Sequence, residues 1–107
     1  MQTITSIDDN HFQSDVLDKE GVTVVRFWAT WCPPCTRMKP IFNEVAGELD
    51  GKAGFAEVDI DKAPQVASAL GIRSVPTVVM FKNGKQVDGI VGVAPKSQYI
   101  NSIQAQL

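Results

Sequence analysis

The chain contains two cysteines, Cys32 and Cys35, and their spacing is the first indication of chemistry in this sequence. A Cys-x-x-Cys pair occurs in zinc sites, in structural disulfides and in redox centres. A closed zinc site needs four ligands, whereas the two thiols and the single histidine, His11, amount to three. We therefore predict no metal site within a single chain. A metal ion or iron–sulfur cluster shared between two copies of the chain remains an alternative.

A redox role for this pair is favoured over a structural disulfide. Cross-linking so short a loop removes little entropy from the unfolded chain, and cytosolic thiols are kept reduced. The attacking species in disulfide exchange is a thiolate. The residues from Cys32 to Gly51 predict a helix, and its first N–H groups and its dipole would favour an anion at Cys32. We therefore expect Cys32 to be the nucleophile and Cys35, one turn further in, to be the resolving thiol.

The strands that position this helix are predicted from hydrophobic patterning. Residues 22–28 are β-branched or aromatic and apolar on both faces, which is typical of a central strand. Residues 55–60 predict a second interior strand. Residues 77–81 and 86–91 predict a hairpin, because Asn83-Gly84 between them is a strong turn signal.

Three further helices are predicted around the sheet. The first begins after Asp8, a suitable N-cap, and ends before Gly21. The second runs from Pro64 to Gly71, and the third runs from Pro95 with a buried stripe that ends at Leu107. Alternating helices and strands followed by a hairpin and a helix argue for an α/β fold with a mixed sheet covered on both faces.

The composition excludes several classes of protein. A length of 107 residues predicts one domain, residues 1–107, that can fold without stabilising disulfides or metal ions. Ten basic and twelve acidic residues give a net charge of −2, which argues against nucleic acid as a partner. No apolar run is long enough for a membrane span. Residues 1–6 lack the pattern of a secretory signal, so we expect a cytoplasmic protein unless a leader has been removed.

Several segments of the chain, in this order and spacing, resemble the thioredoxin family from end to end. The resemblance implies the thioredoxin fold, a central mixed five-stranded sheet flanked by four helices. The matching segments are Phe27-Trp-Ala-Thr-Trp-Cys-Pro-Pro-Cys35, Pro40, Val58-Asp-Ile-Asp61, Gly71-Ile-Arg-Ser-Val-Pro-Thr77, Phe81-Lys-Asn-Gly84 and Val91-Gly92.

This resemblance also implies an activity and a substrate surface. It implies a general protein-disulfide reductase, monomeric and without a bound cofactor, that receives electrons from NADPH through thioredoxin reductase and passes them to diverse disulfide-containing proteins. It further implies a cis bond before Pro76, whose turn would expose the backbone of Val75 to an extended substrate segment. The expected substrate-binding rim around Cys32 comprises Trp31, Pro34, Val75, Pro76, Val91, Gly92 and Val93.

The sequence departs from the family at three positions. Pro33 replaces the usual glycine, which removes one N–H donor near Cys32 and stiffens the loop. Arg26 stands where the family places a buried acid, and Glu57 stands where it commonly places a lysine. We predict that these two residues form an ion pair of reversed polarity on adjacent strands; the alternative is that Arg26 extends to solvent and Glu57 is exposed.

The reversed pair would alter how the resolving thiol ionises. Arginine cannot accept a proton, so Glu57 becomes the candidate base for Cys35, acting through a water molecule. Arg26 would instead favour the Cys35 thiolate by direct electrostatics.

Two other functions are alternatives to that of a thioredoxin-like reductase. A glutaredoxin-like, glutathione-dependent reductase is disfavoured by the Pro33-Pro34 pair and by Trp31 before Cys32. A thioredoxin-fold binding or chaperone module, in which the dithiol is incidental, is disfavoured by the intact Cys-Pro-Pro-Cys motif. We expect Trp28 to pack beneath the site and His11 to lie on the surface, away from it.

Overall fold

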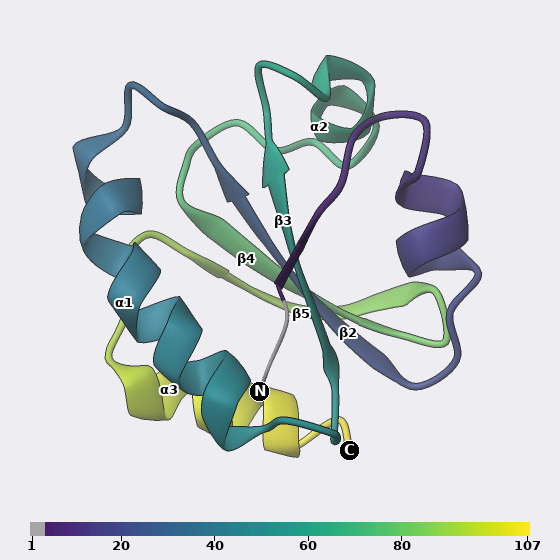
Figure 1. Cartoon of the computed structure of the whole chain (residues 1–107), viewed down its shortest axis with the longest axis vertical. Coiled ribbons are helices and arrows are strands. Elements are labelled where there is room, and N and C mark those ends of the chain that lie inside the picture. The colour runs from purple at the N-terminus through teal and green to yellow at the C-terminus, as the bar shows by residue number, and fades with distance from the viewer. Residues whose placement is uncertain (1–3) are drawn as a thin grey trace.

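Five strands form one mixed sheet in the order β1-β3-β2-β4-β5 in the computed structural model, which describes residues 4–107 (Figure 1). Strand β3 pairs in parallel with β1 and β2, and β4 pairs antiparallel with β2 and β5. The first three residues of the segment in which no secretory signal was predicted lie outside the described range. The strands are β1 (Ile4–Ser6), β2 (Val22–Trp28), β3 (Gly54–Asp59), β4 (Thr77–Lys82) and β5 (Lys85–Val91).

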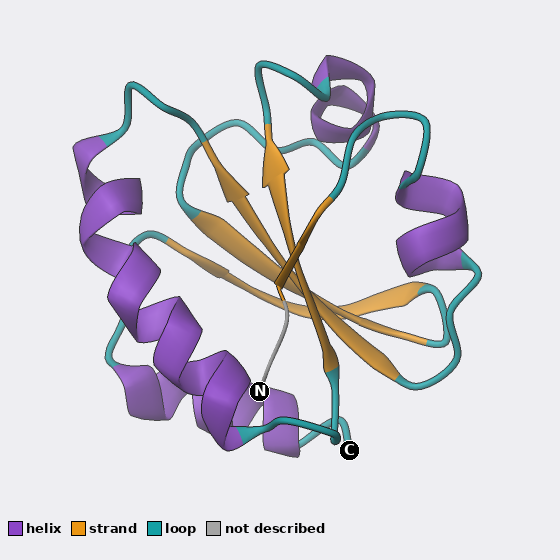
Figure 2. Cartoon of the chain, viewed as in Figure 1, coloured by secondary structure: helices purple, strands orange, loops and turns teal. Residues whose placement is uncertain are grey.

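Helices cover both faces of this sheet (Figure 2). Helices α1 (Pro33–Glu48) and α3 (Lys96–Gln104) lie on one face. On the other face lie α2 (Pro64–Ala69) and η1 (Gln13–Leu17), a single turn of π-helix. The described residues thus contain the five strands and four helices expected of a thioredoxin fold. No helix among residues 4–107 has the length and apolar character needed to cross a membrane.

Two apolar cores, one on each face, result from side-chain alternation along the central strands. Successive residues of β2 point to opposite faces, so Val24 packs in the core under α1 and α3, and Val25 packs in the core under η1 and α2. Arg26 follows Val25 and therefore points, like Val24, to the face covered by α1. This alternation is what brings a charged side chain beneath the first turn of α1.

Two expectations about the ends of elements are wrong. Asp8 does not cap the first helix: its carboxylate accepts from the N–H of Asn10 in a preceding turn, and the helix is confined to η1. Leu107 is 51% exposed because α3 ends at Gln104, so it lies beyond the buried stripe. The pattern analysis also missed β1, whose three residues acquire their extended form by pairing with β3.

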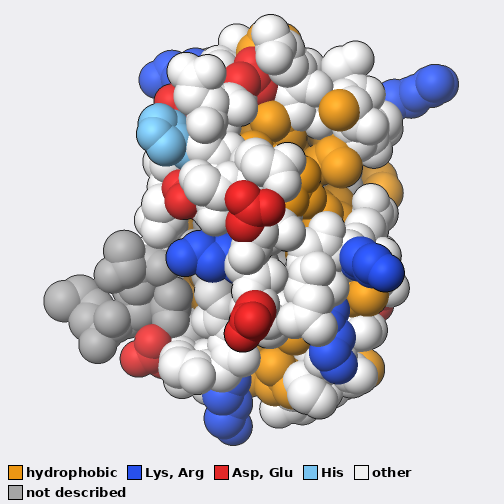
Figure 3. Space-filling view, turned by 90° about the vertical axis from the view of Figure 1, so that its right-hand side faces the viewer, with side chains coloured by type: hydrophobic (Ala, Val, Ile, Leu, Met, Phe, Trp, Pro, Cys, Tyr) orange, Lys and Arg blue, Asp and Glu red, His pale blue; other side chains and the backbone are white. Residues whose placement is uncertain are grey.

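The single histidine lies on the surface, as predicted (Figure 3). The side chain of His11 is 63% exposed, and its Nδ1 lies 2.7 Å from the Oδ1 atom of Asp8. This hydrogen bond raises the pKa of His11 and lowers the pKa of Asp8. The pair belongs to the segment before η1, which is remote in sequence from the dithiol.

Candidate active site

Cys32 occupies the junction between β2 and α1 and is the N-cap of that helix. Its sulfur accepts a hydrogen bond from the backbone N–H of Cys35 at 3.2 Å. Pro33 and Pro34 fill the first two helical positions, and neither has an N–H group. The N–H of Cys35 is therefore the first backbone donor that α1 offers to the Cys32 sulfur, which confirms that Cys32 sits at a helix start.

The two cysteines form a disulfide, with their Cα atoms 5.3 Å apart. Cys32 is 4% exposed and Cys35 is 1% exposed, so the second sulfur is the more shielded. Both pack with Ala29 in a small apolar cluster, and the partly buried Trp28 lies against it. Trp28 is thus a packing residue at the site, as predicted.

The loop that precedes β4 lies directly beside this disulfide. The Val75–Pro76 peptide bond is cis, as the resemblance implied, and the carbonyl oxygen of Val75 is 3.6 Å from the Cys32 sulfur. Thr77 holds the loop from below, because its hydroxyl donates to the carbonyl of Ser74 at 2.8 Å. The backbone of Val75 is therefore placed next to the reacting sulfur.

The residues of the predicted rim are apolar, and most of them are exposed or partly exposed. Trp31 is 63% exposed, Val91 is 72% exposed and Val93 is 46% exposed. Pro34, Val75 and Gly92 are partly exposed. Pro76 is buried, so it contributes little accessible surface; it directly precedes the buried strand β4, and its carbonyl accepts from the N–H of Gly92 at 2.9 Å. Pro76 thus ties the two rim loops together.

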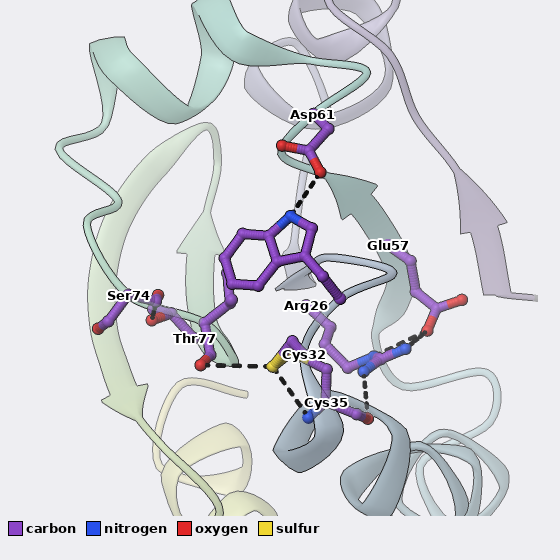
Figure 4. The surroundings of a disulfide bond; sticks show 9 residues. Arg26, Cys32, Cys35, Glu57, Asp61, Ser74 and Thr77 are labelled. Carbon is purple, nitrogen blue, oxygen red and sulfur yellow. Dashed lines mark hydrogen bonds and ion pairs between the residues drawn. A yellow bond between two sulfur atoms is a disulfide. The ribbon is translucent and has the colours of Figure 1, made fainter.

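Two residues that hold the rim were missed in the sequence. Asp61 accepts from the indole N–H of Trp31 at 2.8 Å and so fixes the orientation of that ring; Figure 4 labels Asp61 near the disulfide. The hydroxyl of Tyr99, on α3, accepts from the N–H of Ala94 at 3.1 Å and donates to the carbonyl of Gly92 at 3.2 Å. Burial raises the pKa of Tyr99. Asp61 belongs to the segment Val58-Asp-Ile-Asp61 that resembles the family, but only the fold reveals that its partner is Trp31.

Beneath the disulfide, Arg26 and Glu57 form the predicted ion pair. They are directly opposite each other on β2 and β3, with Nε and Nη2 of Arg26 at 2.8 and 2.6 Å from Oε2 of Glu57. Only 2% of the Arg26 side chain and 12% of the Glu57 side chain is exposed, so the alternative in which Arg26 reaches solvent is wrong. Lys39 approaches Glu57 from the outside, with its Nζ 3.5 Å from Oε1.

Arg26 also reaches the dithiol itself. Its Nη1 donates to the carbonyl oxygen of Cys35 at 3.0 Å (Figure 4). The guanidinium carbon lies 5.7 Å from the ring centroid of Trp28 and 5.9 Å from that of Phe42. Hydrogen bonds, an ion pair and aromatic rings therefore hold this cation in one place below the second cysteine.

This arrangement is suited to thiol–disulfide exchange. The Cys32 sulfur lies beside the backbone carbonyl of Val75, and the more buried Cys35 lies next to the charged pair of Arg26 and Glu57. Among residues 4–107 there is no group of three or more His, Cys, Asp or Glu side chains placed to hold a metal ion.

The chain is similar to known thioredoxins along its whole length. The Thioredoxin family model matches residues 3–105. Thioredoxin 1 of Nostoc sp. is 39% identical over 107 residues, which is 100% of both chains. Thioredoxin of Staphylococcus saprophyticus is 38% identical over 104 residues, 97% of this chain and 98% of that one. With its Cys32–Cys35 disulfide, the protein is a thiol–disulfide oxidoreductase that reduces protein disulfides, and it belongs to the thioredoxin family.

Proposed function

We propose that the chain is a single-domain, monomeric electron carrier with a division of labour between its two thiols. Cys32 is the nucleophile and Cys35 is the resolving thiol. The observation that carries this assignment is the position of the Cys32 sulfur, which accepts from a helix N-terminal N–H and borders the rim, while Cys35 is almost fully buried. A helix N-terminus favours a thiolate there because of its unpaired N–H groups and its dipole.

In this mechanism the reduced protein transfers two electrons in two steps. The Cys32 thiolate attacks one sulfur of the substrate disulfide, forms a mixed disulfide and releases the other sulfur as a thiolate. The Cys35 thiolate then attacks Cys32, which forms the Cys32–Cys35 disulfide and releases the second substrate thiolate. The two thiol protons of the carrier are balanced by protonation of the two substrate thiolates.

We further propose that Glu57 accepts the proton of Cys35 through a water molecule. It is the carboxylate bonded to the buried Arg26, and Arg26 in turn bonds the backbone of Cys35. Replacing Glu57 by Gln should slow the resolving step and change the pH at which Cys35 ionises. An unchanged thiol pKa together with unchanged turnover would exclude this role.

Substrates are proposed to bind as extended segments across the rim. The carbonyl of Val75 can pair with a substrate N–H, and Trp31, Pro34, Val91, Gly92 and Val93 offer an uncharged surface around it. Backbone pairing carries little sequence information, so this surface suits diverse disulfide-containing proteins.

We propose that thioredoxin reductase recharges the protein with electrons from NADPH and that the chain itself holds no cofactor. A carrier of this kind has to be returned to the dithiol state after each cycle. The cytoplasm, where thiols are kept reduced, is the compartment that fits this cycle.

Reduction of insulin disulfides tests the proposal. We expect turnover with NADPH and thioredoxin reductase and little with glutathione and glutathione reductase. Turnover only with glutathione would identify a glutaredoxin-like protein. No turnover in either system would instead favour the binding or chaperone module and overturn the proposal.

A further inference from the structure

The buried Arg26 is a costly residue that packing alone does not explain. A charged side chain in the middle of a sheet is tolerated only when it is paired and hydrogen-bonded. All three nitrogens of its guanidinium group have partners: Nε and Nη2 contact Glu57, and Nη1 contacts the carbonyl of Cys35. The guanidinium group therefore bridges β3 and the first turn of α1.

The contact with Cys35 is made to the backbone that carries the resolving sulfur. Cys35 is the third residue of α1, and its N–H is already bonded to the Cys32 sulfur. With its carbonyl held by Arg26, both polar groups of the Cys35 backbone are fixed. A charge-assisted hydrogen bond of this kind restrains position more strongly than a neutral one.

The charged surroundings of Cys35 are unevenly distributed. Arg26 comes from β2, Glu57 from β3 and Lys39 from α1; Lys39 is 55% exposed, so solvent screens it, which leaves Arg26 and Glu57 as the more buried charges of the three. Asp59 follows on the same face of β3, and its carboxylate accepts from the N–H of Asp61. Tyr99 on α3 also faces this region and senses the charge of Arg26. Arg26 is thus the buried charge that is bonded to Cys35.

We propose that Arg26 is a positioning residue for the resolving thiol: held by Glu57, it fixes the Cys35 backbone and favours the Cys35 thiolate. The inference rests on the proposed role of Cys35. Its consequence is that the orientation of the Arg26–Glu57 pair, with the cation nearer to Cys35, sets the pH dependence of the resolving step. Because a stabilised thiolate stabilises the dithiol state, the same orientation makes the couple more oxidising.

Exchanging the two charges tests this inference, because R26E/E57R keeps an opposite-charge pair but reverses its orientation. A mixed disulfide between Cys32 and a chromogenic aryl thiol is formed at acidic pH, and attack by Cys35 is then started by a jump to higher pH. The step releases the aryl thiolate, whose absorbance gives the rate at each pH. We expect the midpoint of the profile to move to higher pH, with a rate about tenfold lower below that midpoint.

Further variants keep the test decisive if the exchanged protein does not fold. R26Q/E57Q removes both charges with little change of shape and should move the midpoint in the same direction. Arg26→Lys, which keeps the cation, should restore most of the original profile. Lys96→Gln is the matched control: it removes one cation that pairs with Glu48 elsewhere on α1, and it should leave the profile unchanged.

The equilibrium with a reference dithiol gives a second readout, followed by the fluorescence of Trp28, which packs against the disulfide. At a pH above both midpoints, where Cys35 is a thiolate in both reduced proteins, the exchange should favour the disulfide form about tenfold, equivalent to about 30 mV. A folded R26E/E57R or R26Q/E57Q protein with the wild-type midpoint and equilibrium would overturn the inference. If only the inference about Arg26 is wrong, the mixed disulfide on Cys32 still forms in all of these proteins. If the wild type fails to form that mixed disulfide, the proposed function is overturned as well.

Discussion

The two sides of the disulfide differ in almost every physical property. The rim above Cys32 is exposed and apolar, and the backbone carbonyl of Val75 lies beside the sulfur. The region below Cys35 is buried and charged, with Arg26 bonded to both Glu57 and the Cys35 carbonyl. A surface that accepts many partners gains from having few specific contacts, whereas ionisation of one thiol requires charges held at fixed positions.

The comparison also separates what this chain shares with its family from what it does not. The rim is defined by the residues that the resemblance implied, and all of them except Pro76 are exposed or partly exposed. The charged pair below it has the polarity opposite to the one that the resemblance implied, and the fold accepts either polarity because β2 and β3 place residues 26 and 57 opposite each other. The proposed substrate side can therefore stay constant while the buried side is changed.

Serine variants of the two cysteines should give the largest effect. Both should abolish turnover, but Cys35→Ser should accumulate a mixed disulfide on Cys32 because the second attack is lost. Cys32→Ser should accumulate none. Mass spectrometry after incubation with a disulfide-linked peptide distinguishes the two. Trapping by Cys32→Ser and not by Cys35→Ser would reverse the assigned roles.

Removal of one partner of the buried pair should be the next largest effect. Glu57→Ala leaves Arg26 without its counter-ion, and we expect the free energy of unfolding in urea to fall by about 3 kcal/mol. Replacing both residues, as in R26M/E57L, should cost clearly less, because no buried charge remains. Equal losses in the two proteins would mean that packing, and not the charge, determines the effect.

Tyr99 lies on α3 and bonds the backbone of Gly92 and Ala94 at the rim. Tyr99→Phe therefore tests whether the rim depends on the buried side of the molecule. The variant leaves the buried N–H of Ala94 without its partner, which should lower stability by about 1–2 kcal/mol. Because burial raises the pKa of Tyr99, the wild type should lose stability as the pH rises above the usual value of 10.0. Titration of unfolding shows whether Tyr99→Phe loses this alkaline dependence.

A charge placed on the rim should weaken substrate binding. Val91→Asp introduces a carboxylate that a bound segment would have to desolvate, and we expect KM for insulin to rise about fivefold with kcat little changed. Val87→Asp, on the same strand and 42% exposed, is the matched control and should leave KM as it is. Equal effects at both positions would show that net charge, and not the rim, is responsible.

The exposed pair Asp8–His11 should give the smallest effect. The lowered pKa of Asp8 contributes stability above its usual 3.8, and this is lost as the pH falls through the folded value. The raised pKa of His11 contributes stability below its usual 6.5, and this is lost as the pH rises through the folded value. Comparing His11→Asn with wild type should therefore reveal a small loss between these two values and none at alkaline pH. A loss of the same size at alkaline pH would contradict a charge effect.

The sequence predicted the elements that have strong local signals. Asn83 and Gly84 have positive φ values of 52° and 80° in the hairpin turn, and a side chain at Gly84 would clash with the carbonyl of Leu17. The apolar run of β2 indicated its central place. By contrast, Asp8 was assigned a cap it does not form, and β1 was missed, because a carboxylate has several local N–H groups to bond and a three-residue edge strand exists only through its pairing with β3.

The site divides in the same way. The type and spacing of Cys32 and Cys35 were enough to predict a redox dithiol at a helix start, because thiolate chemistry and helix capping act over a few residues. Family motifs added the rim, apart from the buried Pro76. Asp61 bonds Trp31, which is 30 positions away, and Tyr99 bonds Ala94 and Gly92, which are 5 and 7 positions away. No local sequence pattern selects these partners.

What the sequence determined by itself is the reaction: two thiols with helix-start geometry, and a cation and an anion whose charges had to be paired if both were buried. Only the tertiary structure decided where those charges act. Strand register placed Arg26 opposite Glu57, and side-chain alternation turned it toward α1, where its remaining N–H groups met the carbonyl of Cys35. Register and alternation are set by the pairing of distant segments, which is why the contact beneath the resolving thiol belongs to the fold.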